Sequence, residues 1–144
     1  MAAGHMKTAA GRGKRITIVD DARDFLDLMR LVLEPRGYAL TCIAEHASLD
    51  ALLESRPDLL MIDLRLAQPS RDLSGWELVV LASHHESLAA VPILVCSADL
   101  SELRGRTEQI GSSERLEMLA KPFDLETLER TVERLLSASH RQSA

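Results

Sequence analysis

The sequence predicts an α/β protein in which five parallel strands form one sheet and helices cover both of its faces. Five short apolar runs alternate along the chain with five segments of helical character. Two of these runs, LLMID at 59–63 and ILVCS at 93–97, are apolar at successive positions, which is typical of strands buried on both faces. Strands that alternate with helices are joined by crossover connections, and such connections produce a parallel sheet.

Length and composition fit a single globular domain. The chain has 144 residues, of which 46% are hydrophobic and 27% are charged. No apolar run approaches the ~20 residues that span a bilayer, and no signal-peptide pattern opens the chain. We therefore expect a cytoplasmic protein without a membrane partner.

Charge is distributed unevenly along the chain. Residues 1–15 contain four basic residues and no acidic one, so the other 129 residues carry −9 and the chain as a whole −5. We expect residues 1–14 to be a disordered leader, in which Gly4, His5 and Met6 resemble a cloning remnant. The acidic remainder and an aromatic content of 3% argue against nucleic acid as a partner.

The first half of the chain contains three expected strands and two expected helices. The strands are 16–19, 38–44 and 59–63. The helix after the first strand ends before Pro35 and Gly37, and a shorter helix is expected at 48–55. The apolar stripe of the first helix consists of Phe25, Leu28, Met29, Val32 and Leu33.

The second half is expected to contain two further strands and three helices. In order, the elements are a polar loop at 65–74, a helix at 76–86 that follows Gly75, a strand at 93–97, a polar helix at about 99–110, a strand at 115–120 and a helix at 124–136. Asp124 is suited to be the N-cap of the last helix, whose apolar face is formed by Leu128, Val132 and Leu135. The domain is expected to end at 137, before a polar tail at 138–144.

Polar residues follow the carboxyl ends of four of the expected strands. They are Asp20, Asp21, Asp63, Ser97 and Lys121. The functional crevice of a parallel sheet lies outside these strand ends, so we expect the five side chains to converge. Each also has a structural explanation: Asp20 or Asp21 is suited to cap the first helix, Asp63 to end a strand, Ser97 to begin a helix and Lys121 to lie in a loop. Their joint placement at one edge favours a functional site.

The three aspartates indicate a site for a hard cation. Carboxylates that share a crevice repel one another, and burial adds a desolvation cost. Mg²⁺ takes oxygen ligands and would remove the repulsion among Asp20, Asp21 and Asp63. A carboxylate beside the ion is suited to attack phosphorus and form an aspartyl phosphate. Lys121 would then supply a second positive charge, and Ser97 would donate its hydroxyl to a phosphoryl oxygen.

Five stretches of the chain resemble the receiver domain of response regulators in two-component signalling. They are ITIVDD, PDLLMIDLRL, GWELV, VPILVCSAD and LAKPFD, in this order. The resemblance extends over residues 15–137. It implies a flavodoxin-like three-layer sandwich with five helices and the strand order 2-1-3-4-5.

The resemblance also implies roles for the individual residues. Asp63 resembles the phosphoacceptor, Lys121 the lysine that contacts the phosphoryl group, and Ser97 the switch hydroxyl. The implied Mg²⁺ ligands are Asp20, Asp21, Asp63 and the backbone carbonyl of Arg65. Met118 occupies the switch position, where the family has an aromatic residue. We therefore expect a weaker or differently routed coupling between phosphorylation and the output surface.

The function implied by the resemblance is that of a phosphorylation-dependent signalling receiver. Such a domain is not an enzyme in the usual sense, because it catalyses only its own phosphotransfer and dephosphorylation. The implied donor is a sensor histidine kinase or a histidine phosphotransfer protein. Phosphorylation would alter the binding of an unknown downstream protein, and we expect a monomer or weak dimer.

Three alternative functions or contexts fit parts of the sequence. A phosphatase of the haloacid dehalogenase type requires Asp-x-Asp, whereas Leu64 and Arg65 follow Asp63, which argues against it. A receiver that acts without phosphorylation would normally have lost one of the acids or the lysine. A third alternative is that the domain has been excised from a longer kinase or regulator.

The loop at 65–74 is roughly four residues longer than is usual in the family. Two interpretations fit this extra length: a flap over the site and a surface insertion.

Overall fold

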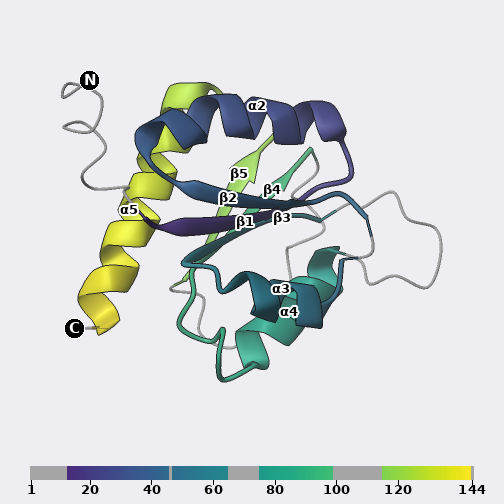
Figure 1. The fold of residues 1–144 in the computed structure, drawn as a ribbon, viewed down its shortest axis with the longest axis vertical. Coiled ribbons are helices and arrows are strands. Elements are labelled where there is room, and N and C mark those ends of the chain that lie inside the picture. The colour runs from purple at the N-terminus through teal and green to yellow at the C-terminus, as the bar shows by residue number, and fades with distance from the viewer. Residues whose placement is uncertain (1–12, 46, 65–74, 99–114, 144) are drawn as a thin grey trace.

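The computed structural model describes residues 13–45, 47–64, 75–98 and 115–143. The strands are β1 (Arg15–Val19), β2 (Ala39–Ile43), β3 (Leu59–Asp63), β4 (Ile93–Ser97) and β5 (Leu116–Ala120). They form one parallel sheet in the order β2-β1-β3-β4-β5 (Figure 1). The fold class and the strand order expected from the sequence are therefore confirmed.

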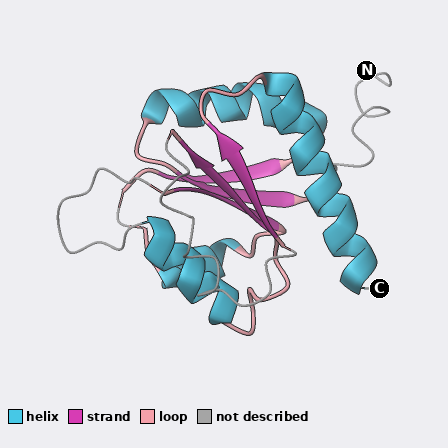
Figure 2. Cartoon of the chain, turned by 180° about the vertical axis from the view of Figure 1, so that it is seen from behind, coloured by secondary structure: helices cyan, strands magenta, loops and turns pink. Residues whose placement is uncertain are grey.

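Helices lie on both faces of this sheet, which gives three layers. The helical elements are α2 (Arg23–Leu33), the 3₁₀ turn η1 (Glu34–Arg36), α3 (Leu49–Ser55), α4 (Gly75–His84) and α5 (Leu125–Ser143). Figures 1 and 2 show α2 and α5 on one face and α3 and α4 on the other. The helix expected at 99–110, the loop at 65–74 and residues 1–12 of the leader lie outside the described residues. Helix α5 continues through 138–143, where the sequence suggested a tail.

Successive residues of β3 pack on opposite faces of the sheet. Leu60 and Ile62 belong to the core under α3 and α4, whereas Leu59 and Met61 belong to the core under α2 and α5. All four side chains are at most 1% exposed. A strand covered on both faces has no polar side, which explains its continuous apolar run.

The predicted apolar stripe of α2 is correct at four positions and wrong at one, since Phe25 and Val32 are partly buried against the same core that contains Met29 and Leu33. Met29 and Leu33 are buried, but Leu28 is 38% exposed and Leu26 takes its place in the core. Apolar residues occur on more than one side of this helix, so periodicity alone did not select the buried side. The buried side faces a core that the sheet and α5 build together, which includes Ile18 and Leu128.

The ends of α2 and α5 follow the expected signals. After α2, η1 contains Pro35, and Gly37 has the left-handed φ of +98° that favours glycine. Before α5, the Asp124 carboxylate accepts a hydrogen bond of 2.6 Å from the Thr127 backbone N–H, as expected of an N-cap. This bond and a further side-chain bond to Thr127 lower the pKa of Asp124.

Candidate functional site

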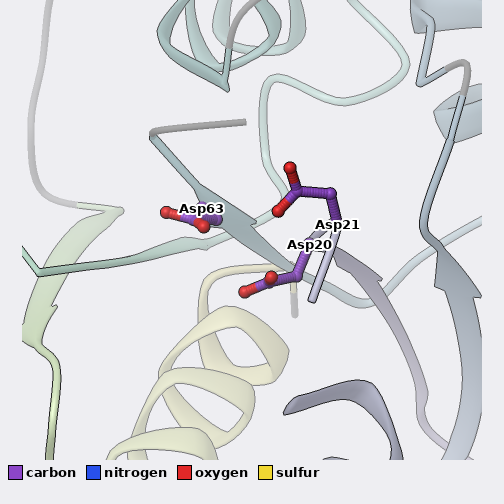
Figure 3. A group of neighbouring side chains, drawn as sticks. All are labelled: Asp20, Asp21 and Asp63. Atoms are coloured by element: carbon purple, nitrogen blue, oxygen red, sulfur yellow. The ribbon is translucent and has the colours of Figure 1, made fainter. Parts of the chain in front are cut away.

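The ends of two adjacent strands bring three aspartates together. Asp20 and Asp21 follow β1, and Asp63 is the last residue of β3, which pairs with β1 in parallel register. One carboxylate oxygen from each residue lies within 4.8 Å of the other two (Figure 3). The predicted convergence of the three acids is therefore present in the structure.

Asp20 combines a structural and a site contact in one side chain. It is 1% exposed, its Oδ1 accepts a hydrogen bond of 2.9 Å from the Ala22 backbone N–H, and its Oδ2 lies 2.7 Å from Lys121 Nζ. The first of these bonds binds the residue that precedes α2. Asp20 therefore contacts the start of α2, although the N-cap is Ala22 and no side chain of the described residues caps the helix, and this contact does not exclude Asp20 from the cluster.

Lys121 provides the positive charge at the acidic cluster. Its Nζ lies 2.7 Å from Asp20 Oδ2 and 3.6 Å from Asp63 Oδ2, and its side chain is 21% exposed. Burial alone would lower the pKa of Lys121, but the hydrogen bond to Asp20 and the charges of both aspartates outweigh it. The pKa of Lys121 therefore lies above its ordinary value, and the side chain is an ammonium ion at neutral pH.

One aromatic ring lies beside this ammonium group, and a second ring packs against the first. Lys121 Nζ is 4.1 Å from the centre of the Phe25 ring, within the range of a cation–π contact. The Phe25 and Phe123 rings meet edge to face, with centroids 6.1 Å apart and planes at 83°. Sequence reasoning assigned Phe25 only to the apolar stripe of a helix. Its contact with Lys121 depends on how α2 lies across the sheet, for which the sequence carries no local signal.

Ser97 lies next to Lys121 through the backbone. It is the last residue of β4, it is fully buried, and its carbonyl oxygen accepts a hydrogen bond of 2.9 Å from the Lys121 backbone N–H. Its neighbour Cys96 stands opposite Asp63 in the β3–β4 register. Burial raises the pKa of the Cys96 thiol to about 12, so this side chain stays uncharged beside the acids.

Gly75 contacts the backbone at Asp63, a relationship that sequence reasoning did not identify. A Cβ at this position would overlap the Asp63 carbonyl oxygen and would lie 2.7 Å from Leu64 Cα. These neighbours are backbone atoms at the end of β3, so they have little freedom to move away. Glycine is required because the start of α4 lies directly against the strand end that carries Asp63.

The remaining predicted site residues lie away from the cluster or outside the described chain. Met118 is in the middle of the edge strand β5, beside Val95 in the register, and is 43% exposed. Arg65, whose backbone carbonyl was expected to bind the metal, lies outside the described residues. The structure therefore brings five of the predicted residues together. Asp20, Asp21 and Asp63 form the acidic cluster, Lys121 pairs with Asp20, and Ser97 is joined to Lys121 through the backbone.

The chemistry of the cluster fits a magnesium ion. All three side chains offer carboxylate oxygens, the ligand type that Mg²⁺ prefers, and Mg²⁺ usually keeps several water ligands beside the few carboxylates that bind it.

In the part of the chain that the structure describes, no helix is both long enough and apolar enough to cross a bilayer.

Comparison with known proteins gives a consistent family. The response regulator receiver domain matches residues 16–133. Over 128 residues the chain is 30% identical to the DNA-binding dual master transcriptional regulator RpaA of Synechocystis sp., covering 88% of this chain and 51% of that protein. It is 28% identical to the alginate biosynthesis transcriptional regulatory protein AlgB of Pseudomonas aeruginosa, covering 90% of this chain and 32% of that protein. The chain thus spans about half or less of these relatives.

Solved structures resemble the chain over most of its length. The receiver domain of a Pseudomonas aeruginosa sensor histidine kinase, solved with a magnesium ion coordinated in its active site cleft, has a TM-score of 0.70 and 26% identity, covering 87% of this chain and 98% of that one. The chemotaxis protein CheY4 of Vibrio cholerae has the same fold, with a TM-score of 0.70 and 23% identity over 85% of this chain and 98% of that one. The chain therefore belongs to the response regulator receiver domain family of two-component signalling.

Proposed function

We propose that the chain is a phosphorylation-dependent signalling receiver whose phosphoacceptor is Asp63. The observation that carries this proposal is the position of the Asp63 carboxylate, which lies within 4.8 Å of the other two acids and 3.6 Å from Lys121 Nζ. A nucleophilic carboxylate needs neighbouring positive charge to accept a phosphoryl group, and this arrangement supplies it.

The contacts of the acids favour Asp63 over Asp20 as the nucleophile. Both oxygens of Asp20 already accept hydrogen bonds, and its side chain is 1% exposed. The Asp63 side chain is 12% exposed and lies farther from Lys121. An incoming phosphoryl donor therefore reaches Asp63 more easily, while Asp20 is better placed to hold the lysine and a metal ion.

The reaction moves one phosphoryl group between two carriers. An Asp63 carboxylate oxygen forms a bond to phosphorus as the bond from phosphorus to the donor breaks, and the donor keeps that electron pair. The Lys121 ammonium is placed to neutralise charge on a phosphoryl oxygen, and the Ser97 hydroxyl is the proposed donor to another. Asp20, Asp21 and Asp63 would hold Mg²⁺, which when bound neutralises further phosphoryl charge.

The finer features of the function are proposals that rest on family membership. The phosphoryl donor would be a sensor histidine kinase or a histidine phosphotransfer protein, the location cytoplasmic, and the activity limited to phosphotransfer and dephosphorylation of the chain itself. The absence of a nucleic-acid partner stays a prediction for this chain, since the DNA-binding name of RpaA describes a protein of which it spans about half. The weaker coupling expected from Met118 likewise stays a prediction.

Labelling with acetyl phosphate tests the proposal. Intact-mass spectrometry should detect one phosphate-sized adduct in the presence of Mg²⁺ and none in the presence of EDTA. Asp63→Asn should abolish the adduct, because the amide keeps the shape of the side chain and removes the nucleophilic oxygen. Asp50→Asn is the matched control, since Asp50 is an exposed acid in the first turn of α3. An adduct that persists in Asp63→Asn would overturn the assignment.

A further inference from the structure

A hollow of about 510 Å³ lies at the edge of the sheet opposite the acidic cluster. Its lining includes the polar residues Arg15, Arg56, His85 and Ser87 and the apolar residues Leu53 and Leu88. We call this the basal hollow. No acidic residue lines it, although the chain has 22 acidic and 17 basic residues. Its volume lies in the range typical of small-molecule sites, and its charge is opposite to that of the chain.

Arg15, the first residue of β1, is held in place by groups around the basal hollow. Its Nε donates a hydrogen bond of 2.5 Å to the Arg56 carbonyl oxygen. Asp58 accepts a bond of 2.8 Å from the Arg15 backbone N–H and lies 4.0 Å from its Nη2. A guanidinium has five N–H donors, so donors remain for a ligand after these contacts are made. A side chain that is already positioned loses less conformational entropy when it binds.

Arg56 occupies a backbone conformation that does not favour arginine. It is the C-cap of α3 with a φ of +49°, in the left-handed region where helices commonly place glycine. In the described part of the chain, no hydrogen bond or ion pair of its guanidinium group was found. A long cationic side chain at a strained position without a structural partner indicates a role outside the fold itself.

His85 supplies a third donor. Its Nδ1 accepts a hydrogen bond of 3.1 Å from the Ser87 backbone N–H. In the neutral ring the proton must then be on Nε2, which is able to donate to a ligand. The lining of the basal hollow thus includes two arginines and a histidine together with apolar residues.

We propose that the basal hollow binds a small organic phosphate. Phosphate oxygens would accept hydrogen bonds from the guanidinium groups of Arg15 and Arg56 and from His85 Nε2. The organic part would pack against Leu53 and Leu88. Phosphate is the favoured anion because its oxygens match several donors at once and the planar guanidinium binds it through two parallel bonds. The site is separate from Asp63, since β1 runs from Arg15 at this edge to the acidic cluster at the other.

Titration of the ¹⁵N-labelled full chain with phenyl phosphate in EDTA tests this proposal. The amide shifts should concentrate at Leu53, Arg56, Ser87 and Leu88, and inorganic phosphate, which lacks the apolar part, should bind more weakly. Arg56→Gly should weaken binding about tenfold, the effect of losing one charge-assisted contact. Because glycine accepts the left-handed conformation, this variant should melt at or above the temperature of the wild-type chain. Arg56→Asn is a second variant for the same binding measurement, because asparagine also tolerates the left-handed conformation.

Arg30→Gln is the matched control, because it removes one exposed positive charge from α2. It should leave the phenyl phosphate affinity within about twofold, since a distant surface charge is screened by salt. The proposal is wrong if shifts are scattered over the surface, if they gather at the acidic cluster, or if Arg30→Gln weakens binding as much as Arg56→Gly. It is also wrong if inorganic phosphate binds as tightly as phenyl phosphate.

Discussion

Lys121 Nζ lies 2.7 Å from Asp20 Oδ2 although the two residues are 101 positions apart in the chain. Asp20 follows β1 and Lys121 follows β5, which are the first and last strands along the chain. The ion pair therefore connects their carboxyl ends, at the edge of the sheet that holds the acidic cluster. It also places the ammonium group 3.6 Å from Asp63. In the absence of a metal ion, this one cation offsets the charge of a nearly buried carboxylate.

Replacing Lys121 by methionine should destabilise the metal-free protein. Asp20 would be left buried beside two acids without its ammonium partner, and breaking such a pair costs about 3 kcal/mol of unfolding free energy. Urea denaturation in EDTA measures this loss, and added Mg²⁺ should restore part of it. Lys14→Met is the control, since Lys14 precedes β1 at the opposite edge of the sheet. Equal losses in the two variants would contradict the account.

Replacing Phe25 by leucine should slow phosphorylation without preventing folding. The ring lies 4.1 Å from Lys121 Nζ, and loss of a cation–π contact of about 0.5–1 kcal/mol corresponds to roughly a threefold slower rate. The rate of adduct formation with acetyl phosphate at saturating Mg²⁺ measures this effect. Phe25→Tyr should retain the wild-type rate because it keeps the aromatic face. Slow phosphorylation in Phe25→Tyr as well as in Phe25→Leu would contradict a role for the aromatic face, since tyrosine keeps that face.

Gly75→Ala should destabilise the protein although alanine is the better helix former. The added Cβ would overlap the backbone at Asp63, and overpacking of this kind costs about 1–3 kcal/mol. Helix propensity alone would instead stabilise α4 by up to about 1 kcal/mol. The sign of the change in unfolding free energy therefore decides between the two effects. A more stable variant that is phosphorylated normally would rule out the close approach of α4 to β3.

Asp124→Ala should lower the stability of the protein near neutral pH and have less effect in acid. The hydrogen bond from the Thr127 N–H lowers the pKa of Asp124 below its ordinary value of 3.8 in the folded state. The contribution of a carboxylate with a lowered pKa is present above the ordinary value and is lost as the pH falls through the folded-state value. Melting temperatures of both proteins from pH 7 downward should therefore converge. Asparagine caps the helix without titrating, so the melting temperatures of Asp124→Asn and Asp124→Ala should not converge as the pH falls.

Local chemistry made the sheet and the core of the site predictable. Continuous apolar runs identified the inner strands, and polar residues at their carboxyl ends identified Asp20, Asp21, Asp63, Ser97 and Lys121. Each of these signals is visible in the sequence because it concerns a residue and its immediate neighbours in the chain. The strand order came from the family resemblance, since no local signal in the chain fixes it.

Features that depend on how elements pack were not predictable. Leu26 lies in the core in place of Leu28 because the sheet and α5 together determine which side of α2 is covered. The contact of Phe25 with Lys121 and the approach of Gly75 to Asp63 each join segments that are distant in sequence. Nothing in the local composition distinguishes this phenylalanine from a core residue or this glycine from an ordinary helix start.

The most direct test of the central claim is to locate the phosphoryl group on the chain. Borohydride reduces an aspartyl phosphate to homoserine, so protein treated with acetyl phosphate and Mg²⁺ and then reduced should carry homoserine at position 63. Tandem mass spectrometry of the peptide that contains β3 identifies the modified position. We predict modification at Asp63 alone and none in EDTA. Homoserine at Asp20 or Asp21, or no modification at all at Mg²⁺ concentrations that stabilise the protein, would contradict the account.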